Sequence, residues 1–523
     1  MTKKPFRPSA LGLALFACTA GTALAQTTEP EQMTGLGGWT TDAVFTIGES
    51  FGSYAPPGIP DGQGAFDRGN TVQIVANHEL RASQGYPYTL DSGAVLTGAR
   101  ISSLEIDKAT RQLVNLGPAY DTIINRAGEV VMSSADLDFG GLNRLCSAGY
   151  VAAGQAGFVD DIMLTGEESY GGTEFVLDVQ GEVLYAAPWM GRAAWEAAAA
   201  LEVPTINNTH VAVLVGDDRG DAALLLYVGE KQAGSFLERN GLANGRLYMW
   251  VADNGDLSPA DWSGTGTSRK GTFVEVNNYD PSQAGSANSQ GETGFDELGF
   301  ATQAELDSQK AAIGAFNFSR PEDVHTNPAP GKGGQVVFAS TGRNTSINQG
   351  SDLWGATYLV DVKINYGRIR TGNIEATITI LYDGDDAGAG QVAAPDFGIR
   401  SPDNLVWGDD GIIYIQEDRS ISAFGDDSGQ ETSIWSLDPK TGLIDRVAQM
   451  NRSAVPTGQV DTDPTDLGDW ESSGIIDVTN VFGAKGERLL FLNTQAHSLR
   501  GGSIDSENLV QGGQFLFMSR PER

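Results

Sequence analysis

Short apolar segments that alternate with turns rich in Gly and Asp recur from residue 72 to residue 493. Runs of this kind, bounded by Gly, Asn or Asp, are typical of β-strands. They predict strands at residues 72–76, 100–106, 129–132, 161–164, 174–178, 211–215, 223–228, 246–251, 335–339, 358–362, 374–381, 412–416, 433–437 and 488–493. Convincing helices are few, so the chain is predicted to be one large all-β body.

A faint internal repeat indicates how these strands are organised. Residues 104–113 and 436–443 share a strand, an Asp, a turn that contains Thr, and a return strand. A Gly stands before a short apolar strand at Gly334, Gly411 and Gly486. Repeats spread over hundreds of residues indicate the blades of a β-propeller. The composition agrees with this, because 67 Gly and 21 Pro can supply many tight turns.

Two segments interrupt the strand pattern. The alanine-rich residues 192–201 predict a short helix, and residues 302–313 predict another after a loop rich in Gly, Ser and Asn. Long insertions between blades usually form the mouth of the central funnel, which is where function is expected.

The first 25 residues have the pattern of a secretory signal peptide. Lys3, Lys4 and Arg7 form a basic region, an apolar run follows at residues 10–17, and Ala-Leu-Ala at 23–25 is a small-residue cleavage site. The mature chain would begin at Gln26, with residues 26–40 as a flexible leader, and would be exported to the periplasm or the extracellular space. No later stretch is apolar enough for stable insertion into a membrane.

The net charge of -33 limits the possible partners. Nucleic acid is excluded as an expected partner, because phosphate neutralisation needs clustered Lys and Arg. An acidic excess instead favours solubility, cation binding, or both. Cleavage of the signal would remove Cys18 and leave Cys146 as the only thiol. A lone cysteine is either an inert buried side chain or one kept as a ligand or nucleophile.

Acidic residues gather where apolar strands begin or end. The clusters are Asp61-Gly62, Asn77-His78-Glu79, Glu167-Glu168, Asp217-Asp218, Arg320-Pro321-Glu322-Asp323, Asp403-Asn404 and Glu417-Asp418. Each of these clusters could be a solvated turn. If strand ends converge on a propeller axis, however, the carboxylates could share one pocket and bind hard cations, while Arg320 could bind an oxyanion.

The ordered series of motifs resembles the PhoX-type bacterial alkaline phosphatases. The residues that carry the resemblance are Asn77 to Leu80, Cys146, Gly166 to Glu168, Gly191-Arg192 with Glu196, Gly216 to Asp218, Ser319 to Asp323, Trp354-Gly355, and Ser401 to Leu405. The resemblance covers nearly all of the mature chain.

The resemblance implies a secreted, six-bladed β-propeller enzyme over residues 41–523, expected as a monomer, that hydrolyses small phosphate monoesters. It also implies a cluster of ferric iron and calcium. Cys146, Glu196 and Glu322 would be iron ligands, joined by one of Glu167 and Glu168. Arg320 would bind the phosphate. Candidates for the calcium side are Glu79, Asp217, Asp218, Asn404 and Glu417.

Two other functions remain open for such a chain. A calcium-dependent lactonase or other esterase would need Glu322 and Asn404 but not Cys146. A non-catalytic calcium-binding propeller would keep the acidic strand ends for stability alone. Replacing Cys146 separates both from the phosphatase.

Overall fold

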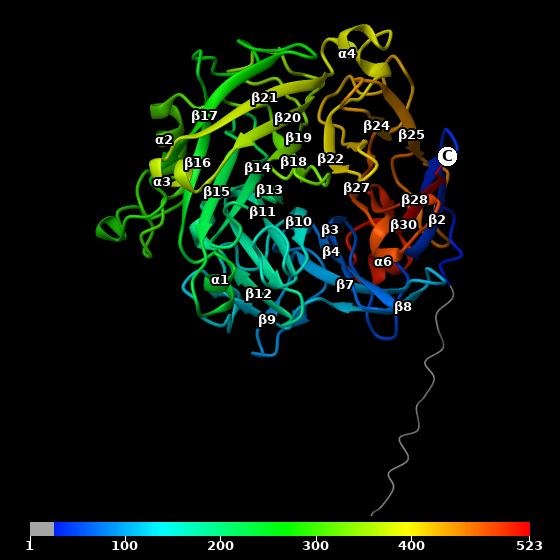
Figure 1. The fold of residues 1–523 in the computed structure, drawn as a ribbon. Helices are drawn as coiled ribbons and strands as arrows, with labels where there is room; N and C mark the ends of the chain where they lie inside the picture. The colour runs from blue at the N-terminus through cyan, green and yellow to red at the C-terminus, as the bar shows by residue number, and fades with distance from the viewer. Residues whose placement is uncertain (1–25, 523) are drawn as a thin grey trace, which may run out of the picture.

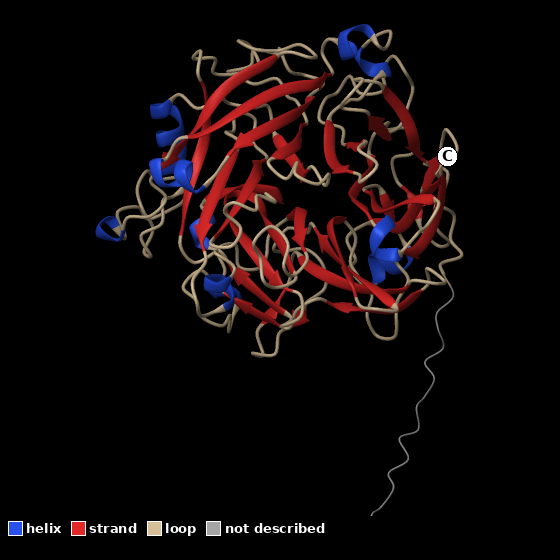
Figure 2. Ribbon diagram, in the orientation of Figure 1, coloured by secondary structure: helices blue, strands red, loops and turns tan. Residues whose placement is uncertain are grey.

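The strands of the computed structural model radiate as blades from a central axis (Figure 1). The structure describes residues 26–522, so the predicted signal peptide at residues 1–25 lies outside the described part of the chain. Nearly all regular structure is strand, and the helices are short and peripheral (Figure 2). The prediction of an all-β propeller is confirmed.

The first three blades follow the chain from the amino terminus. One contains β3 (Pro60–Asp67), β4 (Thr71–His78), β7 (Arg100–Asp107) and β8 (Leu113–Pro118). The next contains β10 (Leu145–Val151), β11 (Ile162–Asp178), β12 (Val183–Ala186) and β9 (Thr122–Ile124). The third contains β13 (Arg192–Ala200), β14 (His210–Asp217), β15 (Leu225–Glu230), β16 (Gly245–Ala252) and β17 (Ser268–Val276).

The remaining blades include two strands from the start of the chain. One blade contains β18 (Pro321–Thr326), β19 (Gln335–Ser340), β20 (Ala356–Lys363) and β21 (Ile374–Asp383). The next contains β22 (Pro402–Trp407), β23 (Ile413–Glu417), β24 (Ser433–Leu437), β25 (Ile444–Met450) and β1 (Met33–Gly35). The last contains β27 (Trp470–Asp477), β28 (Glu487–Ala496), β30 (Gly512–Pro521) and β2 (Thr40–Thr46).

The shorter elements lie between or outside the blades. They are β5 (Tyr88–Thr89), β6 (Val95–Leu96), β26 (Val460–Asp461), β29 (Leu499–Arg500), α1 (Phe236–Arg239), α2 (Gln303–Ile313), α3 (Tyr366–Thr371), α4 (Ala387–Gly390), α5 (Thr479–Phe482) and α6 (Gly502–Ser506), with single 3-10 turns at Ser134–Asp136, Pro188–Met190, Pro281–Gln283 and Pro395–Phe397.

Six inner strands form the wall around the axis. Going around the ring, β3 contacts β10, which is followed by β13, β18, β22 and β27, and β27 contacts β3 again. This closed ring is the arrangement that six blades would have. Hydrophobic clusters fill the spaces between neighbouring blades, for example Phe45 and Phe491 between the blades of β27 and β3.

The amino-terminal segment closes the propeller, in contrast to the flexible leader expected at residues 26–40. Strand β1 pairs with β25 at the register Met33 with Met450, and β2 pairs with β30. Met33 is buried, and the backbone N–H of Gln32 donates to Gln514 Oε1 at 2.9 Å. The two ends of the chain therefore share blades, and the segment is held by strand pairing.

The helix predicted at residues 192–201 is wrong, because this segment is strand β13. Alanine favours helices, but that preference is weak and tertiary packing overrides it. Here β13 pairs with β11 on one side and β14 on the other. Small side chains also permit a close approach of β10, since a Cβ on Gly149 would lie 1.7 Å from Ala198 O. The second predicted helix is confirmed as α2.

Most predicted strands overlap strands of the structure. Residues 161–164 and 174–178 belong to one long strand, β11, where two strands were expected. Residues 129–132 form only an isolated bridge, between Val130 and Ile124. Among the described residues, no helix has the length and apolarity that a membrane crossing requires.

Candidate metal centre

Every strand of the inner ring has a β-bulge. In each case two consecutive residues lie opposite one residue of the neighbouring strand. The bulged pairs are Asp61-Gly62, Cys146-Ser147, Glu196-Ala197, Glu322-Asp323, Asp403-Asn404 and Gly474-Ile475. Bulges bend a strand, re-aim its side chains and are frequent beside active sites. Five of the six bulges begin with an acidic residue or with the lone cysteine.

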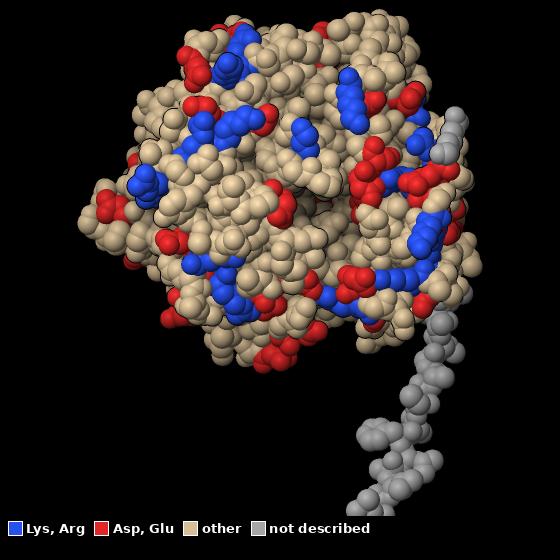
Figure 3. All heavy atoms as spheres, in the orientation of Figure 1, with Lys and Arg blue, Asp and Glu red and all other residues tan. Residues whose placement is uncertain are grey.

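These side chains form one continuous group near the axis, which we call the axial group. It consists of three overlapping sets whose ligand atoms lie within 4.8 Å of one another: Asp61, Glu79 and Cys146; Cys146, Glu168 and Glu196; and Glu196, Asp218 and Glu322. Cys146 and Glu196 link the sets. In the view of Figure 3 the surface is hollowed near the centre of the ring.

Two arginines face the axial group. Arg144 Nε lies 2.7 Å from Glu79 Oε1, and its guanidinium also pairs with Glu168. Arg320 lies 2.6 Å from Asp218 and 2.8 Å from Glu322. Two guanidinium groups cannot balance six carboxylates and a thiol, so the group as a whole lacks positive charge.

Burial dominates the electrostatics of the group. It raises the pKa of Glu196, and the neighbouring Glu322 and Glu168 raise it further. Burial and the charge of Glu79 raise the pKa of Asp61 to about 7. Burial alone would raise the pKa of Asp218, but its ion pair with Arg320 outweighs this and holds the pKa below its usual range.

The surroundings of Glu196 indicate whether the axial group could bind a cation. The residue is 1% exposed, and neither carboxyl oxygen has a hydrogen-bond partner among residues 26–522. A buried carboxylate without donors is costly unless a cation compensates it. Carboxylates and a thiol within one shell are a donor set that suits borderline transition ions as well as harder cations. The residues present therefore fit metal ions.

Further acidic residues extend the group around the ring. Burial, followed by Glu322, Asp418 and Asp61, raises the pKa of Asp403. Burial and the charge of Asp418 also raise the pKa of Glu471. Beside Asp61, Asn404 Oδ1 accepts a 2.7 Å hydrogen bond from Ser473 Oγ. Asn404 thus lies at the edge of the axial group.

Two predicted ligands, Glu167 and Asp217, lie outside the axial group because successive residues of a strand face opposite sides. Glu167 points away from Glu168 and accepts the backbone N–H groups of Asn143 and Thr173, each at 3.2 Å. Asp217 forms an ion pair with Arg219, in which Arg219 Nη2 lies 2.6 Å from Asp217 Oδ2. Of the two acidic pairs, Glu168 and Asp218 are the members that lie in the axial group.

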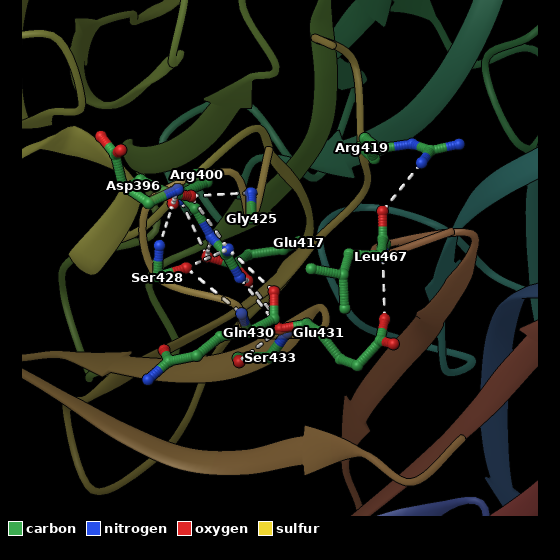
Figure 4. A network of polar contacts seen from close by, with 12 residues as sticks. Asp396, Arg400, Glu417, Arg419, Gly425, Ser428, Gln430, Glu431, Ser433 and Leu467 are labelled. Carbon is green, nitrogen blue, oxygen red and sulfur yellow. Dashed lines mark hydrogen bonds and ion pairs between the residues drawn. The ribbon is translucent and has the colours of Figure 1, made fainter. Parts of the chain in front are cut away.

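Glu417 belongs instead to a buried structural network (Figure 4). It is fully buried and pairs with Arg400 at 2.8 Å. Its carboxylate also accepts hydrogen bonds from the Arg400 and Ser433 backbone and from Trp435 Nε1. Both carboxyl oxygens of Glu417 therefore already accept hydrogen bonds within this network.

Five residues in or beside the axial group were not predicted from the sequence as site residues: Asp61, Arg144, Asp403, Asp418 and Glu471. Asp61, Asp403 and Asp418 stood in the acidic clusters of the sequence, but the inner strands that carry Asp61 and Asp403 were not predicted from it. No sequence signal marked Arg144 or Glu471, which reach the site only through the fold.

Glu167 gives a testable dependence of stability on pH. Burial and the nearby Asp138 raise its pKa to about 8. The folded protein therefore holds this proton more tightly than the unfolded chain, and the stabilisation is complete below about pH 4.3 and lost as the pH rises through 8. We expect Glu167→Gln to remove a slope of about 1.4 kcal/mol per pH unit between roughly pH 5 and 8. Denaturant unfolding of both proteins across this range measures it, and equal slopes would contradict the assignment.

A β-propeller with a buried acidic and thiol group at its axis defines a class of candidate metalloenzymes. Within that class, residues 183–467 match the family described as alkaline phosphatase PhoX, and because this is more than half of the chain, the protein belongs to that family. It is accordingly a phosphatase, and the resemblance stated from the sequence is confirmed.

One solved structure supports the same fold. PhoX of Pseudomonas fluorescens, solved in complex with vanadate, a transition state analogue, is similar with a TM-score of 0.62 and 16% sequence identity, over 95% of this chain and 97% of that chain. The β-propeller domain of the Trilobed protease from Pyrococcus furiosus is similar with a TM-score of 0.27 and 8% identity, over 85% of this chain and 96% of that chain. No curated protein sequence matches the chain.

Proposed function

We propose that this phosphatase hydrolyses small phosphate monoesters outside the cytoplasm, using iron and calcium held by the axial group. The observation that carries the proposal is Glu196, a buried carboxylate without a hydrogen-bond donor, which lies between Cys146 and the Arg320-bound Glu322.

The types of donor atom indicate which residues would bind iron and which would bind calcium. Iron accepts a thiolate together with carboxylates, so Cys146, Glu168, Glu196 and Glu322 are the proposed iron ligands. Calcium prefers oxygen donors alone. The proposed calcium side therefore contains Asp61, Glu79, Asp218 and Asn404, with Asp403, Asp418 and Glu471 as further oxygen donors. When bound, the ions would supply Lewis-acid stabilisation of phosphoryl charge and activation of water.

Arg320 is the proposed phosphate-binding residue. Its Nε and Nη2 donate to Asp218 and Glu322, whereas Nη1 donates to no residue within 26–522. A guanidinium fixed by two carboxylates is preorganised, so it can donate to a phosphoryl oxygen without first losing conformational freedom.

The backbone at Arg320 explains how the side chain is held. Its φ is 70°, a left-handed value that is costly for a residue with a Cβ. Its carbonyl accepts a hydrogen bond from Thr341 N at 3.0 Å, and its N–H donates to Arg219 O at 3.1 Å. These bonds hold the strained corner, and such strain is often found at functional sites.

The proposal is tested by elemental analysis of the purified protein together with para-nitrophenyl phosphate hydrolysis, before and after chelation. We expect iron and calcium in the protein, turnover that falls at least about 100-fold on chelation, and recovery when both ions are returned. Calcium without iron, or turnover that survives complete removal of both ions, would refute the proposed metal set. Export is tested separately, by whether the mature chain begins at Gln26.

A further inference from the structure

A second set of carboxylates lies away from the axial group, at one end of the blade that contains β20 and β21. Asp383 is the last residue of β21 and pairs with Ala356, the first residue of β20. Asp352 lies in the loop before β20, and Asp385 lies in the loop after β21. None of these three aspartates belongs to the axial group.

Hydrogen bonds bring the two loops together at this point. Asp385 Oδ2 accepts the N–H groups of Leu353 at 2.7 Å and Trp354 at 3.0 Å. Asp385 N donates to Asp383 Oδ1 at 3.0 Å, and Asp383 Oδ2 accepts from Gly264 N at 2.7 Å. The residues that directly follow Asp352 are thus bound by Asp385, which places Asp352 beside the other two carboxylates.

Among residues 26–522, the carboxylate of Asp352 has neither a hydrogen-bond donor nor an ion-pair partner. It is 3% exposed, and neither of its carboxyl oxygens has a hydrogen-bond partner among residues 26–522. In this described part of the chain, no Lys, Arg or His forms an ion pair with Asp352, Asp383 or Asp385. The Ser319 hydroxyl lies near enough to favour the ionised form of Asp352 slightly, but burial and the charges of Asp385 and Asp383 raise its pKa well above the usual value.

We propose that Asp352, Asp383 and Asp385 bind a calcium ion that ties the loop before β20 to the loop after β21. The donors are carboxylates, with neither His nor Cys among them, and such oxygen-only sites select hard cations. The three carboxylates are spread more widely than the 4.8 Å sets of the axial group. Calcium tolerates this because its shell of six to eight oxygens is flexible and accepts water and backbone carbonyls.

A calcium ion at this site would also restrict the movement of the backbone at Ser319 and Arg320. The loop before β20 also contains Asn348, whose side-chain N–H₂ donates to Ser319 Oγ at 2.7 Å. Gly342 N in the same loop donates to Ser319 O at 2.9 Å. A cation that fixes this loop therefore fixes the residue before Arg320. The site does not depend on which ions occupy the axial group.

The test compares Asp352→Asn with the wild type and with a matched control, Glu174→Gln. Glu174 is also fully buried with two unpartnered carboxyl oxygens, but burial alone raises its pKa and no acidic neighbour contributes. After dialysis against calcium, we expect Asp352→Asn to hold one calcium ion fewer per chain with its iron unchanged. Glu174→Gln should match the wild type. An unchanged calcium content in Asp352→Asn would overturn the site.

Thermal unfolding supplies a second signature. A calcium ion bound only by the folded state raises the melting temperature. Without the ion, removing one buried acid relieves repulsion. Asp352→Asn should therefore melt several degrees below the wild type in calcium, and at or above the wild type after chelation. A simple packing defect would lower the melting temperature in both conditions, and that result would also overturn the proposal.

Hydrogen exchange of the wild type covers the case in which Asp352→Asn does not fold. Calcium should slow amide exchange in residues 351–355 and 383–390 relative to the chelated protein. If these segments exchange equally with and without calcium, while segments of the axial group respond, the aspartates do not bind calcium.

Discussion

Replacing Cys146 with alanine is expected to remove the iron proposed for the axial group and to lower phosphatase turnover by roughly 100- to 1,000-fold, the order of loss when a principal electrostatic element of a site is removed. Cys146 belongs to two of the three sets of the axial group, so its replacement removes a ligand atom from both sets. Burial and the charge of Asp61 raise the pKa of its thiol well above the usual range, and the thiol donates to Asp61 Oδ2 at 3.3 Å. Only a bound cation would favour the thiolate at such a place.

The matched control for this variant is Glu167→Gln. It changes a buried acidic side chain next to Glu168, but one that lies outside the axial group. Iron content, calcium content and turnover are measured on all three proteins. Iron and turnover retained in Cys146→Ala would instead favour the calcium-dependent esterase or the non-catalytic propeller, because neither of those functions needs the sulfur.

Replacing Arg320 with lysine is expected to lower kcat/KM by roughly 100-fold or more while the metal content stays at the wild-type level. Lysine keeps the positive charge but cannot hold Asp218 and Glu322 while presenting a further planar donor to a phosphoryl oxygen. In the proposed site, substrate and phosphoryl transition state would both carry negative charge next to this side chain. We therefore expect a raised KM together with a lowered kcat, measured by steady-state kinetics at fixed metal concentration.

Arg219→Lys is the control for this experiment. Arg219 is a nearby arginine, but it pairs with Asp217 and Asp307, which lie outside the axial group. It should leave kcat/KM within a few-fold of the wild type. If Arg320→Lys loses iron in proportion to its activity, Arg320 holds the carboxylates in place, and the assignment of phosphate binding is wrong.

Many strands outside the inner ring were predictable, whereas the six inner strands were not. Strands such as β4, β14 and β20 have apolar runs bounded by turns, and the sequence pattern located them. No predicted strand fell on β3, β10, β13, β18, β22 or β27, and a helix was predicted where β13 lies. These six strands carry charged residues, Gly or Pro near their starts, and their bulges break the two-residue alternation on which strand prediction depends. The residues that form the site therefore also make the inner strands difficult to predict from the sequence.

Acidic pairs show a second limit of the sequence. Glu167-Glu168, inside β11, and Asp217-Asp218, at the end of β14, are each an acidic pair of which one carboxylate belongs to the axial group. Which member of the pair does so depends on strand register, because a shift of one residue exchanges the two faces. Glu417 shows the same limit differently, since its partner Arg400 lies 17 residues away and becomes its neighbour only when β22 and β23 pair.

Amino-acid composition, turn residues and the order of short motifs determined the fold class, the family and most of the candidate ligands, because these properties depend on residue type and local spacing. The tertiary structure alone decided that the amino-terminal strands complete the last blades, that residues 192–201 form a strand, and that Arg144 and Glu471 reach the axis. Each of these outcomes depends on contacts between residues far apart in the chain, whose energies outweigh the local preferences that a sequence displays.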